Sequence, residues 1–270
     1  MASSTATVGS FEIGRVLSRA FDVITGNAAT FLTLAVVASL PTIAFRYWSM
    51  SQSTQMFTVF QPGGSGSLTG FFGMAVLGAF IYYIFANLLA AALTHGTIVS
   101  LNGRKATPGE CLATGLRHAI PLAIITFLAT LGMMLGFILL IVPGFILLTM
   151  WTVLTPVRVA EQTSIMDTFS RSAELSSGFR WSIFGLLVIY ILIAWAIGLA
   201  VGLVAGVTMI GAGGLGAGGF GQVSILYVLI SGIGTIFTSL FGSTMIASTY
   251  YELRTAKEGV GPEQLASVFE

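Results

Sequence analysis

The sequence predicts an all-α fold: a polytopic bundle of six transmembrane helices with three amphipathic helices at the cytoplasmic surface. Hydrophobic residues make up 55% of the chain and charged residues only 8%, whereas about a quarter of the residues in a soluble domain are charged. The charge lies in short islands, which leave uncharged runs at 47–103, 119–157 and 181–251. A charged phrase also occurs twice, each time directly before an apolar segment.

Six apolar segments are expected to span the membrane, because a spanning helix needs about 20 mostly apolar residues. They cover residues 28–45, 71–100, 120–141, 144–160, 181–208 and 223–250. Pro143-Gly144 is the predicted turn between the third and fourth spans, and the alternative is that residues 120–160 form a re-entrant hairpin. A removable signal peptide is the alternative for the first span. We favour the span, because acidic residues precede the apolar stretch and no clear cleavage site follows.

Positive charge is distributed very unequally between the two sides of this arrangement. One side receives Arg15, Arg19, Arg104, Lys105, Arg117, Arg158, Arg171, Arg180, Arg254 and Lys257. The other side receives Arg46 alone. Because lysine and arginine are enriched in cytoplasmic segments, we expect a multi-pass protein of the bacterial cytoplasmic (inner) membrane with both termini in the cytoplasm.

The repeated phrase reads "LSRAFDVITGN" at 17–27 and "FSRSAELSSGF" at 169–179. Each copy belongs to an amphipathic segment that precedes two predicted spans, and "TPGECLATGLRHAIPLAII" (107–125) is a third, weaker copy. Internal duplication is common in membrane folds. We therefore predict three parallel repeats, each a surface helix followed by two spans. The units cover approximately 10–101, 107–160 and 163–251 of a single transmembrane domain, 1–260, which a cytoplasmic tail follows at 261–270.

Local signals mark the ends of these surface helices. Ser164, with Asp167 three residues on, is typical of a helix N-terminus, and Pro108 suits the first turn of a helix. Gly26 and Gly178 are expected just beyond helix C-termini, where glycine readily adopts a positive φ.

The matched arginines Arg19, Arg117 and Arg171 are the candidate functional residues of the surface helices. One interpretation is a ring around a site for an anionic lipid headgroup. The other is that these helices are structural elbows in the interface, with acids and bases pairing along each helix. We favour the elbows, because the helices are nearly neutral and lack the basic clusters that attract anionic lipid.

Asn87 and His95 are the candidate polar residues inside the membrane, eight residues apart on the second span. They could share a polar site, but interhelical hydrogen bonding is the interpretation we favour. No acidic or basic residue lies in the middle of a predicted span. Because such residues usually serve transport or proton relay, this weakens an ion-coupled transporter.

Two sets of glycines at four-residue spacing predict close helix packing. They are Gly132 with Gly136, and Gly198 with Gly202 and Gly206. The segment "GAGGLGAGGFG" (211–221) matches G-x-G-x-x-G, but no strand–helix–strand unit surrounds it, so we interpret it as a flexible linker.

Catalytic chemistry has little support in the sequence. His95 and His118 are the only histidines and Cys111 the only cysteine, so we expect no metal site, no cofactor and no catalytic residues. The net charge of +1 gives no indication of nucleic-acid binding.

Three stretches resemble bacterial membrane proteins of the glycerophosphoryl diester phosphodiesterase membrane-domain type. They are "ALTHGTIVSLNGRKATPGECLATGLRHAIPL" (92–122), "TPVRVAEQTSIMDTFSRSAELSSGFRW" (155–181) and "YYELRTAKEG" (250–259). The shared features include an "RS-x-x-L-x-x-G" phrase, here Arg171 to Gly178, and an aromatic-acid-Leu-Arg ending. In that family the phosphodiesterase chemistry resides in a separate soluble domain, which this sequence does not contain. The resemblance therefore implies a multi-span membrane fold and no catalytic residues.

Together these observations favour a non-enzymatic membrane protein that acts as a scaffold or accessory factor in envelope or lipid homeostasis. We expect it to contact membrane lipids and to act with a protein partner, and no pattern specifies an oligomeric state. The alternative is a carrier or binder of a lipid or small amphipathic molecule. A more remote alternative is an enzyme acting on lipid headgroups.

Overall fold

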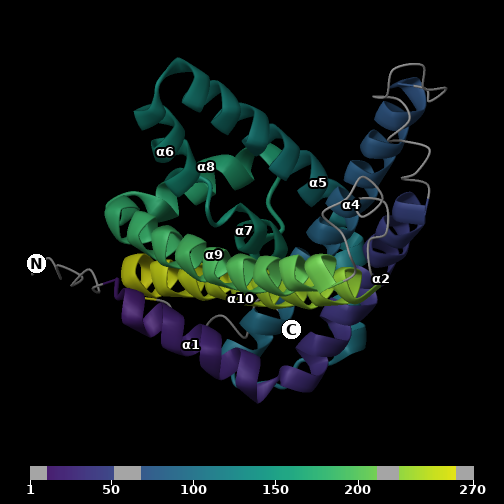
Figure 1. The fold of residues 1–270 in the computed structure, drawn as a ribbon. Coiled ribbons are helices and arrows are strands. Elements are labelled where there is room, and N and C mark those ends of the chain that lie inside the picture. The colour runs from purple at the N-terminus through teal and green to yellow at the C-terminus, as the bar shows by residue number, and fades with distance from the viewer. Residues whose placement is uncertain (1–10, 52–67, 212–224, 260–270) are drawn as a thin grey trace, which may run out of the picture.

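The computed structural model describes residues 11–51, 68–211 and 225–259. Within these ranges the chain forms helices joined by turns and contains no strand, which confirms the all-α fold class. The helices are α1 (Ile13–Gly26), α2 (Ala28–Ser51), α4 (Leu68–Leu101), α5 (Pro108–Leu139), α6 (Ile141–Met150), α7 (Leu154–Glu161), α8 (Ile165–Ser176), α9 (Arg180–Gly211) and α10 (Ile225–Glu258) (Figure 1). Six apolar segments of the described chain are long enough to cross a membrane, which supports a multi-pass membrane protein.

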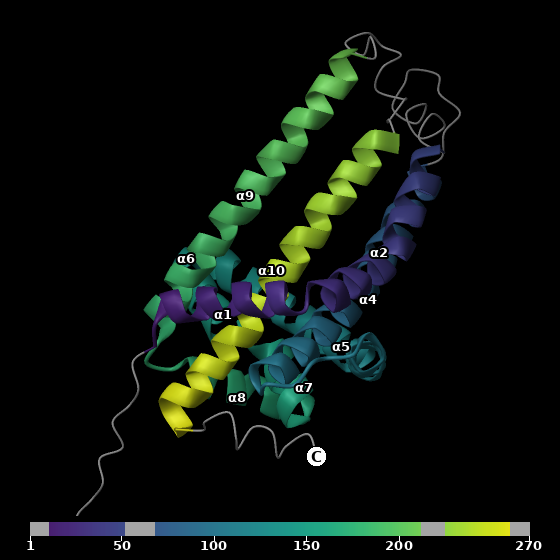
Figure 2. The same ribbon diagram turned by 90° about the horizontal axis from the view of Figure 1, so that it is seen from below.

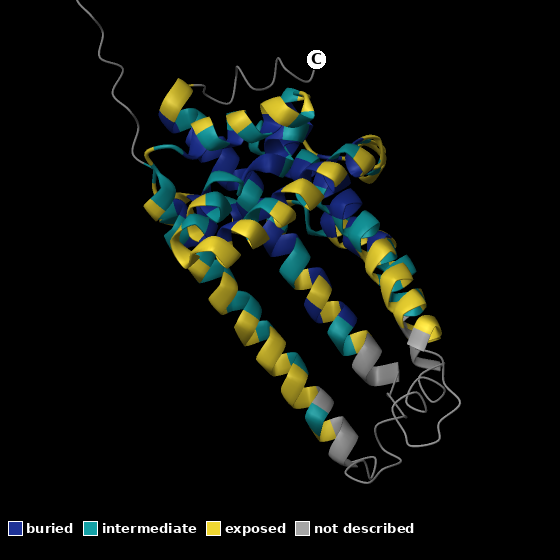
Figure 3. Ribbon diagram, turned by 90° about the horizontal axis from the view of Figure 1, so that it is seen from above, coloured by how far each residue is buried: buried dark blue, intermediate teal, exposed yellow. Residues whose placement is uncertain are grey.

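Buried residues gather at one end of the molecule (Figure 3), where the end of α4, the start of α5, α1, α7, α8 and the last turns of α10 pack together. We call this part the charged end. From it α9, α10 and the α2–α4 pair project toward the ends that border the undescribed segments 52–67 and 212–224 (Figure 2). The most apolar stretch of α9, 18 residues within Arg180–Val204, contains no buried residue. Apolar surface of this extent requires lipid or another protein to cover it.

The predicted turn at Pro143-Gly144 is wrong. α5 ends at Leu139, Leu140 is extended with φ −164° and ψ 148°, and α6 then begins at Ile141. Pro143 therefore lies in the first turn of α6, where its missing N–H breaks no helical hydrogen bond.

Two predicted segments divide differently from the sequence expectation. The fourth span, 144–160, consists of α6 and α7 with a turn at 151–153 between them. The segment 107–125 forms no separate surface helix, because α5 runs without interruption from Pro108 to Leu139. Pro121 consequently lies inside a long helix and not in the first turn of a span.

Most of the predicted helix ends are confirmed. The Ser164 hydroxyl accepts a hydrogen bond from the Asp167 backbone N–H at 3.2 Å, Pro108 begins α5, and Gly178 has a φ of +87°. The prediction for Gly26 is wrong: Gly26 is the last residue of α1, and Asn27 follows with φ −124°. A single residue thus separates α1 from α2, which turns the chain sharply from the charged end into the first span.

The two glycine sets behave differently. A Cβ added to Gly136 would lie 3.2 Å from the Cα of Gly144, and one added to Gly132 would lie 2.7 Å from the Trp151 ring, so this stripe is the seam between α5 and the α6 segment. On α9, a Cβ at any of the three stripe glycines would meet no described atom within 4 Å. The packing seam predicted for α9 is therefore wrong for the part of the chain that the structure describes.

This difference gives a direct test of the α5–α6 seam. Gly136→Val should lower the free energy of unfolding by about 1–3 kcal/mol, because the new methyl groups meet the Gly144 backbone, which cannot move aside. Gly202→Val on α9 is the matched control and should have a small effect. Denaturant titration of both variants in mixed micelles measures the change. Equal losses in the two variants would contradict the assigned seam.

Candidate functional site at the charged end

A buried carboxylate, Glu252 on α10, is the first feature of the charged end. Its side chain is 2% exposed. Arg15 donates from Nε to one carboxylate oxygen at 2.7 Å, and Arg19 of the same helix, α1, binds the other oxygen. The Arg19 guanidinium also lies over the Tyr251 ring, 5.0 Å from its centroid. Because an unpaired buried charge is very costly, the two arginines make the position of Glu252 tenable.

These contacts depend on how α1 folds and packs. Val16 and Ala20, on the face of α1 next to that of Arg15 and Arg19, are fully buried, and they pack with Leu186, Phe241 and Met245 of α9 and α10. Arg15 and Arg19 are four residues apart and so lie on one helix face. We call Arg15, Arg19 and Glu252 the Glu252 clamp.

A second set of charged residues joins α7, α8 and α10 in a closed ring. The Tyr250 hydroxyl donates to Glu161 at 2.9 Å, and Arg171 donates from Nε to the other Glu161 oxygen at 2.9 Å. Arg171 also binds Glu258, which accepts from Arg254 Nε at 2.7 Å. Arg254 closes the ring by donating to the Tyr250 oxygen at 3.3 Å. We call these five residues the Arg171 ring.

The sequence around Arg171 explains why α8 fits here. Ser172 and Leu175 are fully buried, and the Ser172 hydroxyl donates to the carbonyl of Met150 at 2.7 Å. Met150 is the last residue of α6, so Ser172 satisfies a carbonyl that the helix end leaves without a partner. Gly178, with its positive φ, then directs the chain into α9.

The carboxylates around Arg171 stabilise the charged form of its guanidinium. Burial by itself would lower the pKa of the guanidinium. The hydrogen bonds to Glu161 and Glu258 outweigh burial and raise the pKa above its ordinary value. Arg171 therefore serves as a fixed cation of the ring.

The structure places the three predicted arginines in different environments. Arg19 belongs to the Glu252 clamp and Arg171 to the Arg171 ring, so each pairs with its own carboxylates. Arg117 is exposed on α5, and among the described residues no carboxylate pairs with it. Among the described residues, four ion pairs join different helices, and three join neighbours on one helix as the elbow interpretation supposed.

Asn87 lies in a hydrogen-bond network between α4 and α5. Its amide donates to the Tyr83 carbonyl at 2.9 Å and accepts from the Thr126 hydroxyl at 3.0 Å. The Tyr83 hydroxyl is 2.6 Å from the same threonine oxygen. This is the interhelical bonding that the sequence favoured. His95 is partly buried on the same helix, α4.

Sequence reasoning did not select Glu161, Tyr250 and Glu252 as site residues. One signal was available for Glu252: it directly follows the uncharged run 181–251, within the same helix as the last span. An acid at that position must be paired or must reach water. Its arginine partners lie more than 230 residues away, and no local pattern indicates them.

A cleft opens beside the Arg171 ring, with a volume of about 450 Å³. Arg171, Glu174, Lys257 and Phe179 are among its lining residues. Lys257 donates to the Ser177 hydroxyl at 2.5 Å and also binds the Glu174 carbonyl, so it links α10 to the end of α8. Among the described residues no group of three or more histidine, cysteine, aspartate or glutamate side chains is arranged to hold a metal ion. The bonds of Lys257 fix the end of α8 against α10.

The Glu252 clamp predicts a large effect from a small substitution. Glu252→Gln should lower the free energy of unfolding by about 3 kcal/mol, because it leaves two arginines without their shared counter-ion. Glu12→Gln removes a carboxylate that is 56% exposed and 3.8 Å from Arg15, and it should change stability by less than about 0.5 kcal/mol. Unfolding in mixed micelles measures both values, and a Glu252→Gln protein as stable as the control would contradict the clamp.

Arg171→Lys tests the ring. Three different nitrogens of Arg171 bind three different carboxylates, which a single ammonium cannot do. Arg171→Ala should lower the free energy of unfolding by roughly 2 kcal/mol or more. Arg171→Lys should therefore lower it by most of that amount. Arg117→Ala, at an exposed position, should lose little. Full rescue by lysine would show that charge alone, not the ring geometry, matters.

Comparisons of the chain with protein-family models, curated proteins and solved structures gave no match. The resemblance to the membrane-domain type stays a prediction. Two of the stretches that suggested it, 155–181 and 250–259, contribute all five residues of the Arg171 ring. The third stretch, 92–122, contributes none, and function has to be proposed from the geometry itself.

Proposed function

We propose that this chain is a non-enzymatic scaffold or accessory protein of the bacterial cytoplasmic membrane, acting with a protein partner in envelope or lipid homeostasis. The observation that supports it best is the use of charge at the charged end. Glu161, Glu252 and Glu258 are each bound by arginines from other helices or from α10 itself. Carboxylates held this way maintain helix positions, whereas a general acid or base must reach a substrate.

The position of these ion pairs also suits a docking platform. α1, α8 and the end of α10 meet at the charged end, and each contributes to the clamp or the ring. Cross-helix pairs keep this surface in one conformation, and a rigid surface loses little conformational entropy when a partner binds. Met166 on α8 and Phe21 on α1 are 71% and 54% exposed, so apolar contact area is available beside the charges.

The carrier alternative receives less support from the described residues. A carrier should use the polar residues of its spans to line a passage. Asn87 instead has its amide engaged between α4 and α5, and a hydrogen bond to a carbonyl and another to a hydroxyl leave it well satisfied.

Photo-crosslinking in intact membranes distinguishes the two functions. A crosslinking amino acid at position 166, on the platform, should yield a discrete protein adduct, whereas the same group at position 199 of α9, where Leu199 is 59% exposed, should yield lipid adducts. Proteoliposomes containing the purified chain should transfer no lipid between leaflets above the protein-free rate. Lipid adducts alone at both positions, together with protein-dependent transfer, would reject the scaffold in favour of the carrier.

A further inference from the structure

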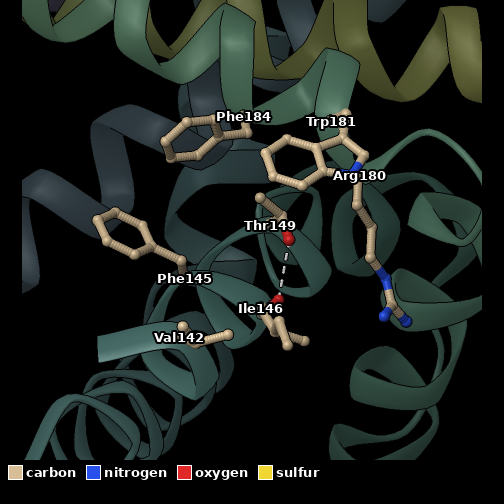
Figure 4. Close-up of a pocket in the computed structure, with 7 residues that line it drawn as sticks. All are labelled: Val142, Phe145, Ile146, Thr149, Arg180, Trp181 and Phe184. Carbon is tan, nitrogen blue, oxygen red and sulfur yellow. Dashed lines mark hydrogen bonds between the residues drawn. The ribbon is translucent and has the colours of Figure 1, made fainter. Parts of the chain in front are cut away.

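A groove of about 410 Å³ lies between α6 and the first turns of α9 (Figure 4). Val142, Phe145 and Ile146 line it from α6, and Arg180, Trp181 and Phe184 line it from α9. Sequence analysis selected none of these residues. The groove is separate from both the Glu252 clamp and the Arg171 ring.

One part of the groove is an aromatic wall. The rings of Phe145 and Phe184 meet edge to face with centroids 5.4 Å apart, and Trp181 meets Phe184 in the same way at 6.2 Å. Trp181 is 86% exposed and Phe145 40% exposed. In a protein whose apolar helices are long enough to cross a membrane, exposed aromatic and aliphatic surface of this kind is suited to an acyl chain, and tryptophan favours the level of the headgroups.

Arg180 supplies a cation at one side of this apolar groove. Among the described residues no carboxylate pairs with Arg180, and its Nε is buried with no hydrogen-bond acceptor. This differs from Arg15, Arg19, Arg171 and Arg254, each of which binds a carboxylate. A buried donor on a cation normally has an acceptor, and phosphate oxygens match the guanidinium geometry well.

The polar and apolar parts of the groove are separated in space. Figure 4 shows Arg180 on the far side of Trp181 from Phe145 and Val142. Thr149 donates its hydroxyl to the Ile146 carbonyl at 2.9 Å, so it adds no free donor to the apolar part. Thr149 is seven positions after Val142, which is about 10 Å along the axis of α6. A ligand that fits this division has an anionic head and an apolar chain.

We propose that the groove binds an anionic glycerophospholipid, with its phosphate at Arg180 and one acyl chain along Val142, Phe145 and Phe184. A second copy of the chain is a less suitable occupant, because an apolar face would bury Arg180 without an anion. The proposal goes beyond the scaffold function and does not depend on it.

Native mass spectrometry of the full chain, with phosphatidylglycerol or phosphatidylcholine of matched acyl chains, tests the site. The wild type should retain phosphatidylglycerol about tenfold more than phosphatidylcholine, which is the size of effect that one charge-assisted hydrogen bond gives. Arg180→Gln should abolish this preference and Arg180→Lys should keep part of it. Arg104→Gln, which removes an exposed arginine between α4 and α5, is the matched control and should leave it unchanged.

A second variant examines the apolar part. Ile146→Trp should fill the groove and lower retention of both lipids, and Val142→Phe serves the same purpose if Ile146→Trp does not fold. Equal retention of the two lipids by the wild type, or an unchanged preference in Arg180→Gln, would overturn the proposal. So would displacement of the lipid by millimolar inorganic phosphate alone, which would indicate a site for a free anion. A change of oligomeric mass in Ile146→Trp with lipid retention intact would assign the groove to a second copy and also overturn it.

Discussion

The burial of Glu252 depends on α1, which lies across α10 and presents two arginines to this carboxylate. The uncharged run that forms the last span ends one residue earlier, at Tyr251, yet the helix continues to Glu258. Every turn of α10 beyond the apolar run therefore needs partners for its charges. α1 provides them for Glu252, and α7 and α8 provide them for Tyr250 and Glu258. The packing of the charged end follows from this requirement.

The Arg171 ring has a different role from the clamp, because it connects three helices in a closed circuit. Glu161 is the last residue of α7, and Gln162 beyond it adopts a left-handed conformation with φ 49°. That turn brings α8 back so that Arg171 reaches the carboxylate ten residues earlier in the chain. Each residue of the ring has partners on both sides, so losing one member leaves others unsatisfied. Such networks define one arrangement more strongly than isolated surface pairs do.

The sequence predicted well what depends on local chemistry. The spans follow from apolar runs, and the ends at Ser164, Pro108 and Gly178 follow from capping preferences. It failed where tertiary packing decides the role of a residue. Pro143-Gly144 is a strong turn signal, but Gly144 instead allows the Phe137 ring to pack against the backbone. A Cβ at Gly144 would lie 2.4 Å from that ring. The sequence could not predict the ion-pair partners, because Arg19 and Glu252 are 233 residues apart in the chain. Opposite charges on one helix suggested local pairing, which the fold contains, but it also forms pairs across helices.

α8 links the charged end to the groove between α6 and α9. Its Ser172 hydroxyl holds the last carbonyl of α6, and only residues 177–179 separate α8 from Arg180 at the start of α9. Phe179 in this connection packs against Phe11 with ring centroids 5.8 Å apart. Both walls of the groove are thus fixed to the helix that carries Arg171. The Arg171 ring and the groove between α6 and α9 therefore share α8 as a common support.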